Sequence, residues 1–417
     1  MRPNIILIVA DDMGYGDCGC YGSQDIRTPC LDTLATEGVR FTDFHSNGAV
    51  CSPTRAALLT GRYQQRTGVE GVITAANHRH VGLPLEERTF ADLLRSNGYR
   101  TAIFGKWHLG YAPKYNPTHR GFDEFRGFVA GNIDYKSHID QIGEEDWWVH
   151  GALEQEEGYT TDLVTEHGVR FIERMKDEPF VLYLAHECPH YPYQGPRDSA
   201  YRTPGKPDPI LGPRTDQDVA YREMMESMDQ GIGRIAATVK QTGIESNTLI
   251  FFFSDNGPSG PGSSGPLRGR KGTLWEGGHR VPAVARWPGV IPSGRVTGET
   301  AIGMDLFPTM MALSATAIPK NLEIDGVDLT PVLKDDGTLP PRDLFWRHKE
   351  QRAVRSGHHK LLINLVDDVE KASLFSVYED VAEKIDIADK APDIVTDLTG
   401  RLKTWESTVS AGVERLS

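Results

Sequence analysis

A cysteine followed four residues later by an arginine is the first pattern in this sequence that could do chemistry. The stretch reads CSPTR, from Cys51 to Arg55, and the run AALLTG after it indicates a helix that stops at Gly61. Ser52 is a preferred helix N-cap residue and Pro53 suits a first helical turn, so we expect Cys51 at a helix N-terminus. Free N–H groups there favour an anion, which Arg55 can also reach. An ordinary capped helix beside a buried cysteine would explain the same residues.

Two pairs of oxygen-bearing side chains follow apolar segments that are typical of buried strands. Asp11 and Asp12 come directly after NIILIVA, and Asp255 and Asn256 come directly after LIFFFS. Carboxylate and amide oxygens are the ligands that a hard cation such as Ca²⁺ or Mg²⁺ prefers. A solvated, glycine-rich turn would account for the first pair alone, but two pairs at strand ends predict one site with four oxygen ligands.

Three more segments add cationic or titratable side chains. FGKWHLG holds Lys106 and His108, which share one side if the chain is extended there. AHECPHYP holds His186 and His190, and the prolines around the second histidine stiffen its backbone. LRGRKGTLWEGG holds Lys271. Each segment alone is also typical of an ordinary basic turn. Because the net charge is −13, an anionic substrate would need such a local group of positive charges.

Taken together, these segments resemble the type I sulfatases, the formylglycine-dependent family. The family signature fits at Cys51, Pro53 and Arg55, a pattern that an average composition would produce about 0.02 times by chance, and LTGRY follows it. The family's GKGTxxEGG pattern matches RKGTLWEGG except at Arg270, and the resemblance spans nearly the whole chain. A cysteine-phosphatase loop would need an arginine at position 57, which is Ala57.

The resemblance implies a chemistry for these residues. In the family the cysteine is oxidised to Cα-formylglycine by a formylglycine-generating or anaerobic maturation enzyme, and the aldehyde hydrate is the nucleophile. The implied metal is Ca²⁺, with Mg²⁺ the weaker alternative, and its ligands are Asp11, Asp12, Cys51, Asp255 and Asn256. The implied catalytic residues are Cys51, Arg55, Lys106, His108, His190 and Lys271. Among them His190 would protonate the departing oxygen and His108 would act as the base.

Specificity is expected from loops rich in Tyr, Trp, His and Arg, which suit stacking on sugar rings and pairing with anions. The resemblance and these loops together predict a sulfuric ester hydrolase that acts on a sulfated carbohydrate derived from a polysaccharide. The predicted sugar contacts are Tyr135, His138, His186, Arg280 and Arg347, although such aromatic residues could also pack between subdomains. Two alternatives stay open: a phosphate or phosphonate ester hydrolase of the same superfamily, and a sulfated-glycan binding protein in which Cys51 is never oxidised.

The order of the apolar segments predicts an α/β fold. Strands that are apolar throughout alternate with helical patterns, which indicates a mostly parallel sheet flanked by helices on both faces, and the resemblance implies the alkaline-phosphatase-like version of it. After about residue 335 the pattern changes to short β segments and a closing amphipathic helix. We therefore predict a catalytic domain over residues 1–335 and a small C-terminal α+β subdomain, with an antiparallel sheet, over residues 336–417.

The amino-acid composition argues against some classes of binding partner. A net charge of −13 over 417 residues argues against nucleic acid or an anionic membrane surface as a partner, and no segment has the apolar length of a membrane span. The opening MRPNIILIVADD has too short an apolar run for a signal peptide and is expected to form a strand. The compartment stays open: periplasmic or secreted if an export signal has been removed, and cytoplasmic otherwise.

Overall fold

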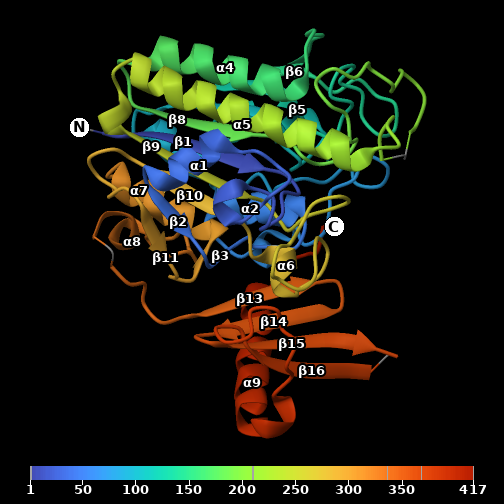
Figure 1. The fold of residues 1–417 in the computed structure, drawn as a ribbon, viewed down its shortest axis with the longest axis vertical. Helices are drawn as coiled ribbons and strands as arrows, with labels where there is room; N and C mark the ends of the chain where they lie inside the picture. Colours follow the sequence, from blue (N-terminus) through green and yellow to red (C-terminus); the bar gives the residue numbers. More distant parts are fainter. Residues whose placement is uncertain (1, 209–210, 336, 368, 417) are drawn as a thin grey trace.

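The computed structural model describes residues 2–208, 211–335, 337–367 and 369–416, and a ten-stranded sheet forms its centre (Figure 1). The strands of this sheet are β1 (Asn4–Ala10), β2 (Val39–Phe41), β4 (Arg100–Lys106), β5 (Glu124–Phe128), β6 (Trp148–Val149), β7 (Ala152–Leu153), β8 (Phe180–Ala185), β9 (Thr248–Ser254), β10 (Ala283–Arg286) and β11 (Arg295–Thr297). Their order is β11-β2-β10-β9-β1-β8-β4-β5-β6-β7. Strand β1 is parallel to both neighbours, and β4 is parallel to β5 and β8, whereas β10 is antiparallel to β9 and β2. The predicted mostly parallel sheet is confirmed.

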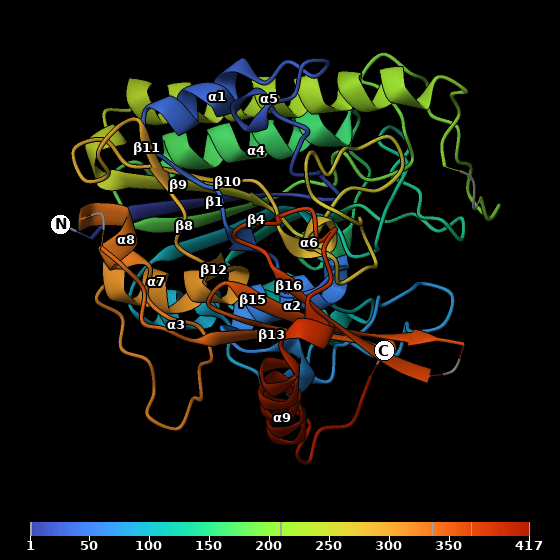
Figure 2. The same cartoon turned by 60° about the horizontal axis from the view of Figure 1, so that its bottom comes forward.

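Helices cover both faces of the sheet (Figure 2). The helices in the described part of the chain are α1 (Pro29–Thr36), α2 (Cys51–Thr60), α3 (Phe90–Ser96), α4 (Thr160–Met175), α5 (Gln217–Gln241), α6 (Glu276–His279), α7 (Leu306–Leu313), α8 (Thr330–Asp335) and α9 (Pro392–Val409). Alternate side chains of a strand point to opposite faces, so Ile6 and Ile8 of β1 share a core with α1, α4 and α5, while Ile5 and Leu7 share one with α2, α3 and α7. Burial on both faces explains why these strands are apolar throughout. Among the described residues, no helix has the length and apolar character needed to cross a membrane.

The carboxyl ends of four parallel strands meet at one edge of this sheet. In the register of β1 and β9, Ala10 lies opposite Ser254. On the other side, Val9 lies opposite Ala185 of β8, which also pairs with Gly105 of β4. The segments that follow β1, β4, β8 and β9 therefore start side by side. In open α/β sheets this is the edge at which ligands bind.

A second sheet of four antiparallel strands follows the large one in the chain. Its strands are β13 (Asp343–His348), β14 (Gln351–Ser356), β15 (His359–Val366) and β16 (Val369–Ser376), and a two-stranded pair is formed by β3 (Phe44–His45) and β12 (Ala301–Ile302). Helix α9 packs on the four-stranded sheet through Leu402 and Trp405. The same core includes Ala49 and Tyr63 from the first part of the chain. The antiparallel C-terminal sheet is confirmed, and the division at residue 335 stays a prediction.

Candidate active site

Helix α2 begins at Cys51, and this places the cysteine at the expected helix N-terminus. Val50 is the residue before the helix, with extended backbone angles (φ −148°, ψ 163°), and Gly61 ends the helix with a left-handed φ of 68°. The prediction that Ser52 caps the helix is wrong. Ser52 lies inside the first turn, and its Oγ accepts a hydrogen bond from the Ile73 N–H at 3.1 Å. The hydroxyl therefore ties α2 to a loop instead of closing the helix end.

Four oxygen-bearing side chains from two strand ends meet beside Cys51. The Asn256 side-chain N–H donates to Asp12 Oδ1 at 2.7 Å, and the Asp12 backbone N–H donates to Asp255 Oδ1 at 3.4 Å. Asp11, Asp12, Asp255 and Asn256 are all buried. Asp12 also has a left-handed φ of 67°, a strained conformation for a residue other than glycine and one that is common at functional sites. The oxygen cluster predicted from the sequence is therefore formed.

Three cations surround these carboxylates. Arg55 Nη2 donates to Asp11 Oδ2 at 3.3 Å, and Lys106 forms an ion pair with the same carboxylate. Lys271 Nζ lies 2.6 Å from Asp12 Oδ1. Burial alone would raise the pKa of Asp11, but the charges of Lys106, His190 and Arg55 lower it. The site thus contains a local group of buried positive charges, although the net charge of the chain is −13.

Two buried oxygens of this centre indicate a further ligand. Within the described ranges, Asp11 Oδ1 and Asn256 Oδ1 have no hydrogen-bond partner, and a buried acceptor left unsatisfied costs free energy. Single ligand atoms of Asp11, Asp12, Cys51 and His190 lie within 4.8 Å of one another. Burial and the charge of Asp11 raise the pKa of Asp255 to about 7, and a bound cation would favour its ionised form. Oxygen ligands with this charge fit a hard divalent cation.

The Cys51 thiol itself is a poor nucleophile at neutral pH. Burial and the charge of Asp11 raise its pKa to about 12, although Lys106 and Lys271 act in the opposite direction. The thiolate is the reactive form of cysteine, and a pKa this high leaves almost none of it. The environment of position 51 therefore keeps an unmodified cysteine in its unreactive thiol form.

His108 follows β4 and lines the cleft described below. The chain is not extended at this point, because His108 has a left-handed φ of 59°, so the condition under which Lys106 and His108 would share one side is not met. Its Nε2–H donates to the Ile73 carbonyl at 3.0 Å, which leaves Nδ1 as the atom with a lone pair. A Cβ on Gly131 would lie 2.7 Å from this Nε2. Burial, with the charges of Lys106 and Arg55, holds the pKa of His108 well below its usual value, so the ring is neutral.

His190 lies beside the oxygen cluster, with one ring nitrogen within 4.8 Å of the Cys51 sulfur. Its Nδ1–H donates to the Tyr191 carbonyl at 2.6 Å, and its Nε2 lies 3.6 Å from Asp12 Oδ2. Burial and the charge of Lys271 lower the pKa of His190 to about 4. An anion bound beside the ring would raise this pKa. The hydrogen bond to the backbone thus aims one specific nitrogen, Nε2, at the centre.

A cleft of about 570 Å³ opens over this centre. Its lining residues are Cys51, 72–77, His108, Tyr111, 130–132, 140–142, His190, Tyr191, Pro207, Ser259 and Lys271. The cleft therefore joins the N-terminus of α2 to the loops that follow β4, β8 and β9. A small ligand in the cleft could reach the nucleophile position, two histidines and a lysine at once.

Comparison with known proteins identifies the family. The family model described as Sulfatase matches residues 3–316 of this chain. The chain belongs to the sulfatase family. Sulfatases use a formylglycine residue and a divalent metal, and the group formed by Asp11, Asp12, Cys51 and His190 could hold such an ion. The candidate active site lies at the carboxyl ends of the parallel strands, and the roles of its residues stay a prediction.

Curated sulfatases and solved structures cover most of the chain. N-acetylgalactosamine-6-sulfatase of Canis lupus familiaris is 36% identical over 384 residues, 86% of this chain and 71% of the relative. Arylsulfatase A of Homo sapiens is 36% identical over 397 residues, 86% of this chain and 74% of the relative. The crystal structure of Ps i-CgsB in complex with k-i-k-neocarrahexaose has a TM-score of 0.89 and 31% identity, covering 100% of this chain and 94% of the other. The PsFucS1 sulfatase from Pseudoalteromonas sp. has a TM-score of 0.82 and 26% identity, over 99% and 92%.

Three aromatic side chains predicted to contact the sugar are not in the cleft lining. The Tyr135 hydroxyl donates to the His190 carbonyl at 2.9 Å, so Tyr135 supports the loop of the histidine from behind. His138 stacks on Trp147 with ring centroids 4.5 Å apart and is buried. His186 is buried at the carboxyl end of β8, and burial lowers its pKa to about 4. All three are enclosed by the fold of this sulfatase.

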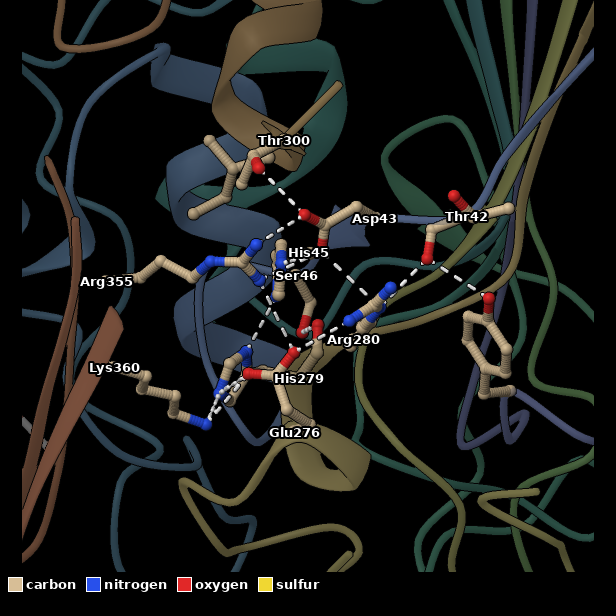
Figure 3. A network of polar contacts seen from close by, with 12 residues as sticks. Thr42, Asp43, His45, Ser46, Glu276, His279, Arg280, Thr300, Arg355 and Lys360 are labelled. Carbon is tan, nitrogen blue, oxygen red and sulfur yellow. Dashed lines mark hydrogen bonds and ion pairs between the residues drawn. The ribbon is translucent and has the colours of Figure 1, made fainter. Parts of the chain in front are cut away.

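The two arginines predicted to contact the sugar are also held elsewhere. Arg280 donates to Glu276 at 3.2 Å and lies 3.4 Å from Asp43 in a buried network (Figure 3). Arg347 donates to Glu70 at 2.8 Å, on the side of the C-terminal sheet. Each guanidinium is paired within the protein and absent from the cleft lining. Contact of these two arginines with the sugar stays a prediction, since in this structure each one pairs with a carboxylate that the fold brings near it.

The sequence carried no signal for part of the sulfatase cleft. Residues 72–77 read VITAAN, without charged or titratable side chains, yet they form one wall. Asp17 is a second omission: it accepts hydrogen bonds from the Tyr221 hydroxyl at 2.6 Å and the Ser263 N–H at 2.8 Å. These contacts fix the loop that leads to Lys271. A glycine-rich turn was the only pattern visible around Asp17.

Proposed function

We propose that this sulfatase removes sulfate from a saccharide of a sulfated polysaccharide, with residue 51 as the position of the nucleophile. The observation that carries the proposal is the convergence of Cys51, the oxygen cluster and the cations at one cleft. A sulfate ester is an anion whose oxygens gain charge during transfer, and preorganised cations stabilise that charge. Membership of the sulfatase family favours sulfate-ester hydrolysis over the phosphate-ester and binding-only alternatives.

Lys106 and Lys271 are proposed to bind the sulfate oxygens. Each forms an ion pair with a carboxylate, Lys106 with Asp11 and Lys271 with Asp12. A divalent cation on these carboxylates would take over their charge and leave the lysines for the substrate. Arg55 is completely buried between Asp11 and Asp255, so its proposed role is to hold the carboxylates in place.

Two groups complete the proposed chemistry. Ca²⁺ would be held by Asp11, Asp12, Asp255, Asn256 and residue 51, where it would lower the pKa of a hydroxyl bound to it. Cα-formylglycine formed from Cys51 would supply a hydrated aldehyde, with one hydroxyl as nucleophile and a second through which sulfate is released. A maturation enzyme that converts the cysteine is therefore a proposed partner.

The two histidines are proposed to move protons. His190 would donate a proton from Nε2 to the departing sugar oxygen, because its Nδ1–H is engaged by a backbone carbonyl. The bound anion would raise its pKa from about 4 and make the protonated form accessible. His108 keeps Nδ1 unprotonated through its Nε2–H bond to the Ile73 carbonyl. It would serve as the base that takes a proton from residue 51.

The cleft supports a saccharide as the alcohol part of the substrate. Its volume of about 570 Å³ lies in the range of small-ligand sites. Tyr111, Tyr191 and aliphatic residues of the 72–77 segment line it, and such surfaces suit the apolar faces of sugar rings. The solved structure of Ps i-CgsB, 31% identical to this chain, is a complex with k-i-k-neocarrahexaose.

Mass spectrometry of the peptide that contains residue 51 tests the nucleophile. Active protein should carry a residue about 18 Da lighter than cysteine, the change for thiol-to-aldehyde conversion. Cys51→Ser should lower kcat at least about a thousandfold, as loss of a nucleophile does, without lowering the free energy of unfolding by more than about 1 kcal/mol. Full activity with unmodified cysteine, or in Cys51→Ser, would refute the proposal.

A substrate panel tests the saccharide. Sulfated mono- and oligosaccharides, a nitrophenyl sulfate and the matching phosphate esters are compared by kcat/KM. We expect the highest value for a sulfated saccharide. Turnover of the aryl sulfate alone would remove the saccharide assignment, and faster phosphate hydrolysis would favour the phosphate ester alternative.

A further inference from the structure

A second group of buried charged side chains lies where the four-stranded sheet meets α6 (Figure 3). We call it the junction network, and its members are Asp43, His45, Glu276, His279, Arg280, Arg355, Lys360 and Glu383. The number of carboxylates in this group equals the number of lysine and arginine side chains. Buried charges are tolerated when each is paired in this way. The network has no part in the proposed chemistry, although α6 follows the segment that carries Lys271.

Lys360 of β15 is the centre of this network. Its Nζ lies 2.9 Å from Glu276 Oε1, 2.9 Å from Glu383 Oε1 and 3.1 Å from His279 Nε2. The side chain of Lys360 has no exposed surface. Glu383 also accepts the backbone N–H of Glu276 through Oε2 at 2.7 Å. One lysine therefore joins the first residue of α6, the last residue of α6 and the loop after β16.

One row of hydrogen bonds links Lys360 to Asp43 through two histidines, and the Leu274 carbonyl also lies 3.3 Å from His279 Nε2. A lysine ammonium only donates and a carboxylate only accepts, so Lys360 donates to His279 Nε2. The His279 Nδ1–H then donates to His45 Nδ1 at 3.0 Å. The His45 Nε2–H in turn donates to Asp43 at 2.9 Å. Both rings are neutral in this arrangement. His45, Glu276 and His279 are close enough to share a metal ion, but the Lys360 ammonium already contacts the nitrogen and the carboxylate that such an ion would need.

The network is connected to the active site through the backbone. The Gly272 N–H, next to Lys271, donates to the Ala49 carbonyl at 2.8 Å, close to the start of α2. Between this point and α6, the Leu274 N–H donates to Gln351 Oε1 of β14 at 2.9 Å. The segment that carries Lys271 is thus held on one side by the α2 region and on the other by β14 and β15.

We propose that Lys360, from the C-terminal sheet, is a positioning residue that keeps Lys271 in reach of the sulfate ester. The inference rests on the proposed sulfate-binding role of Lys271. Lys360 acts through Glu276 and Glu383, which fix α6 and with it the end of the segment that carries Lys271. The C-terminal sheet is then a structural part of the active site, although it supplies no residue to the cleft lining among the described residues.

The test compares Lys360→Met with Lys371→Met in the full-length matured protein. Lys371 is an exposed lysine of β16 in the same sheet, so its variant loses the same charge without touching the network. We expect Lys360→Met to lower kcat/KM about 10- to 100-fold, the range for a slightly misplaced binding group. Its inhibition constant for inorganic sulfate should rise in parallel. Lys371→Met should change neither value by more than about twofold.

Two further variants leave fewer buried charges unpaired and are therefore less disruptive to folding. Lys360→Met combined with Glu383→Gln removes one charge of each sign, and the glutamine oxygen can still accept the Glu276 N–H. Gln351→Leu removes the hydrogen bond to Leu274 and leaves no buried charge unpaired. Both should weaken inorganic sulfate inhibition while the urea unfolding transition stays cooperative. Folded variants with unchanged sulfate inhibition would overturn the proposal.

A double-mutant cycle separates positioning from general structural support. In a Lys271→Ala background, Lys360→Met should lower kcat/KM by less than about twofold, because the group that it positions is gone. Equal losses in both backgrounds would overturn the positioning role while leaving the proposed function intact. Wild-type activity in Lys271→Ala alone would instead refute sulfate binding by Lys271, and the inference with it.

Discussion

At the scale of single residues, burial decides what each group in the active site can do. The same burial that raises the pKa of the Cys51 thiol to about 12 lowers the pKa of His190 to about 4. Both shifts favour the uncharged form, as expected when water is removed. Asp11 is the exception, because neighbouring cations overcome its burial. The site is therefore charged only where opposite charges are in contact.

Replacing His190 should affect substrates according to their leaving groups. A general acid matters most when the departing oxygen is basic, and such catalysis is worth about 10²- to 10⁴-fold. We expect His190→Ala to lower kcat by that factor for a sugar sulfate and by less than about tenfold for nitrophenyl sulfate. Steady-state kinetics on both substrates measure the ratio. Equal losses for the two would remove the general-acid role.

Removing the metal should lower stability as well as activity. A ligand that binds only the folded state stabilises it by about 2.7 kcal/mol at a hundred times its Kd, so Ca²⁺ should raise the Tm of chelator-treated protein. Asp255→Asn takes one charge from the predicted ligand set, and the Ca²⁺ concentration needed for half of the Tm increase should rise. Differential scanning calorimetry at several Ca²⁺ concentrations provides the measurement. The same Ca²⁺ dependence in wild type and Asp255→Asn would contradict the ligand assignment.

At the scale of elements, the ends of strands and helices bring the chemistry together. Strand β1 delivers Asp11 and Asp12, β9 delivers Asp255 and Asn256, and α2 presents Cys51 at its first turn. Regular hydrogen bonding stops at these ends, so backbone groups and side chains are free to meet a ligand. The loops between the elements then decide which side chains face the cleft.

One glycine in such a loop lies against the side chain of His108, the proposed base. A Cβ on Gly131 would lie 2.7 Å from His108 Nε2, closer than real contacts allow. Gly131→Ala should therefore displace the imidazole and lower kcat about 10- to 100-fold, with little change in Tm. Gly151→Ala is the matched control, because its Cβ would meet nothing within 4 Å. Steady-state kinetics with unchanged kcat in Gly131→Ala would argue against a fixed role for His108.

At the scale of the whole molecule, the two sheets share buried charge as well as apolar core. The Arg355 side chain of β14 donates to Asp43 at 2.8 Å, across 312 positions of sequence. Tyr63 and Trp405 pack edge to face with ring centroids 5.2 Å apart. Contacts of both kinds couple the C-terminal sheet and α9 to the segments before and after α2. A chain that stops at residue 335 would leave Asp43 without Arg355 and Glu276 without Lys360.

The junction network should make stability depend on pH. Burial lowers the pKa of His45 and of His279 below the usual 6.5, so the unfolded chain binds protons that the folded protein does not. The free energy of unfolding should therefore fall as pH decreases below 6.5, by up to about 1.4 kcal/mol per pH unit for each histidine. Urea unfolding measured at about pH 7.5 and about pH 5.5 tests this slope.

His45→Gln isolates the contribution of one ring. The glutamine amide can still donate to Asp43, but it does not titrate. Other buried histidines with a pKa of about 4, namely His138, His186 and His190, add to the slope in both proteins. The variant should therefore show a smaller, not a vanished, dependence on pH. Identical slopes in both proteins would exclude His45 as a titrating group.

The sequence was sufficient for the features that depend on local patterns. Apolar runs identified β1 and β9 because a strand buried on both faces admits few polar residues. The family resemblance pointed to Cys51, Lys106 and Lys271, and the structure places both lysines on the carboxylates beside Cys51. Helix α2, which contains Ser52, was correctly predicted. Its cap was not, because the Ser52 hydroxyl accepts a hydrogen bond from the Ile73 N–H instead. Local preferences fail where a distant group offers a better partner.

By itself the sequence determined which residues could do the chemistry and which segments form the buried sheet, because both follow from residue type and short-range spacing. Only the tertiary structure decided which side chains reach the cleft. Residues 72–77 form a wall of it without any motif, whereas Arg280 and Arg347 lie elsewhere, paired with Glu276 and Glu70. The physical reason is that contacts between groups far apart in the chain depend on how the sheets and helices pack, and such packing leaves no short-range pattern.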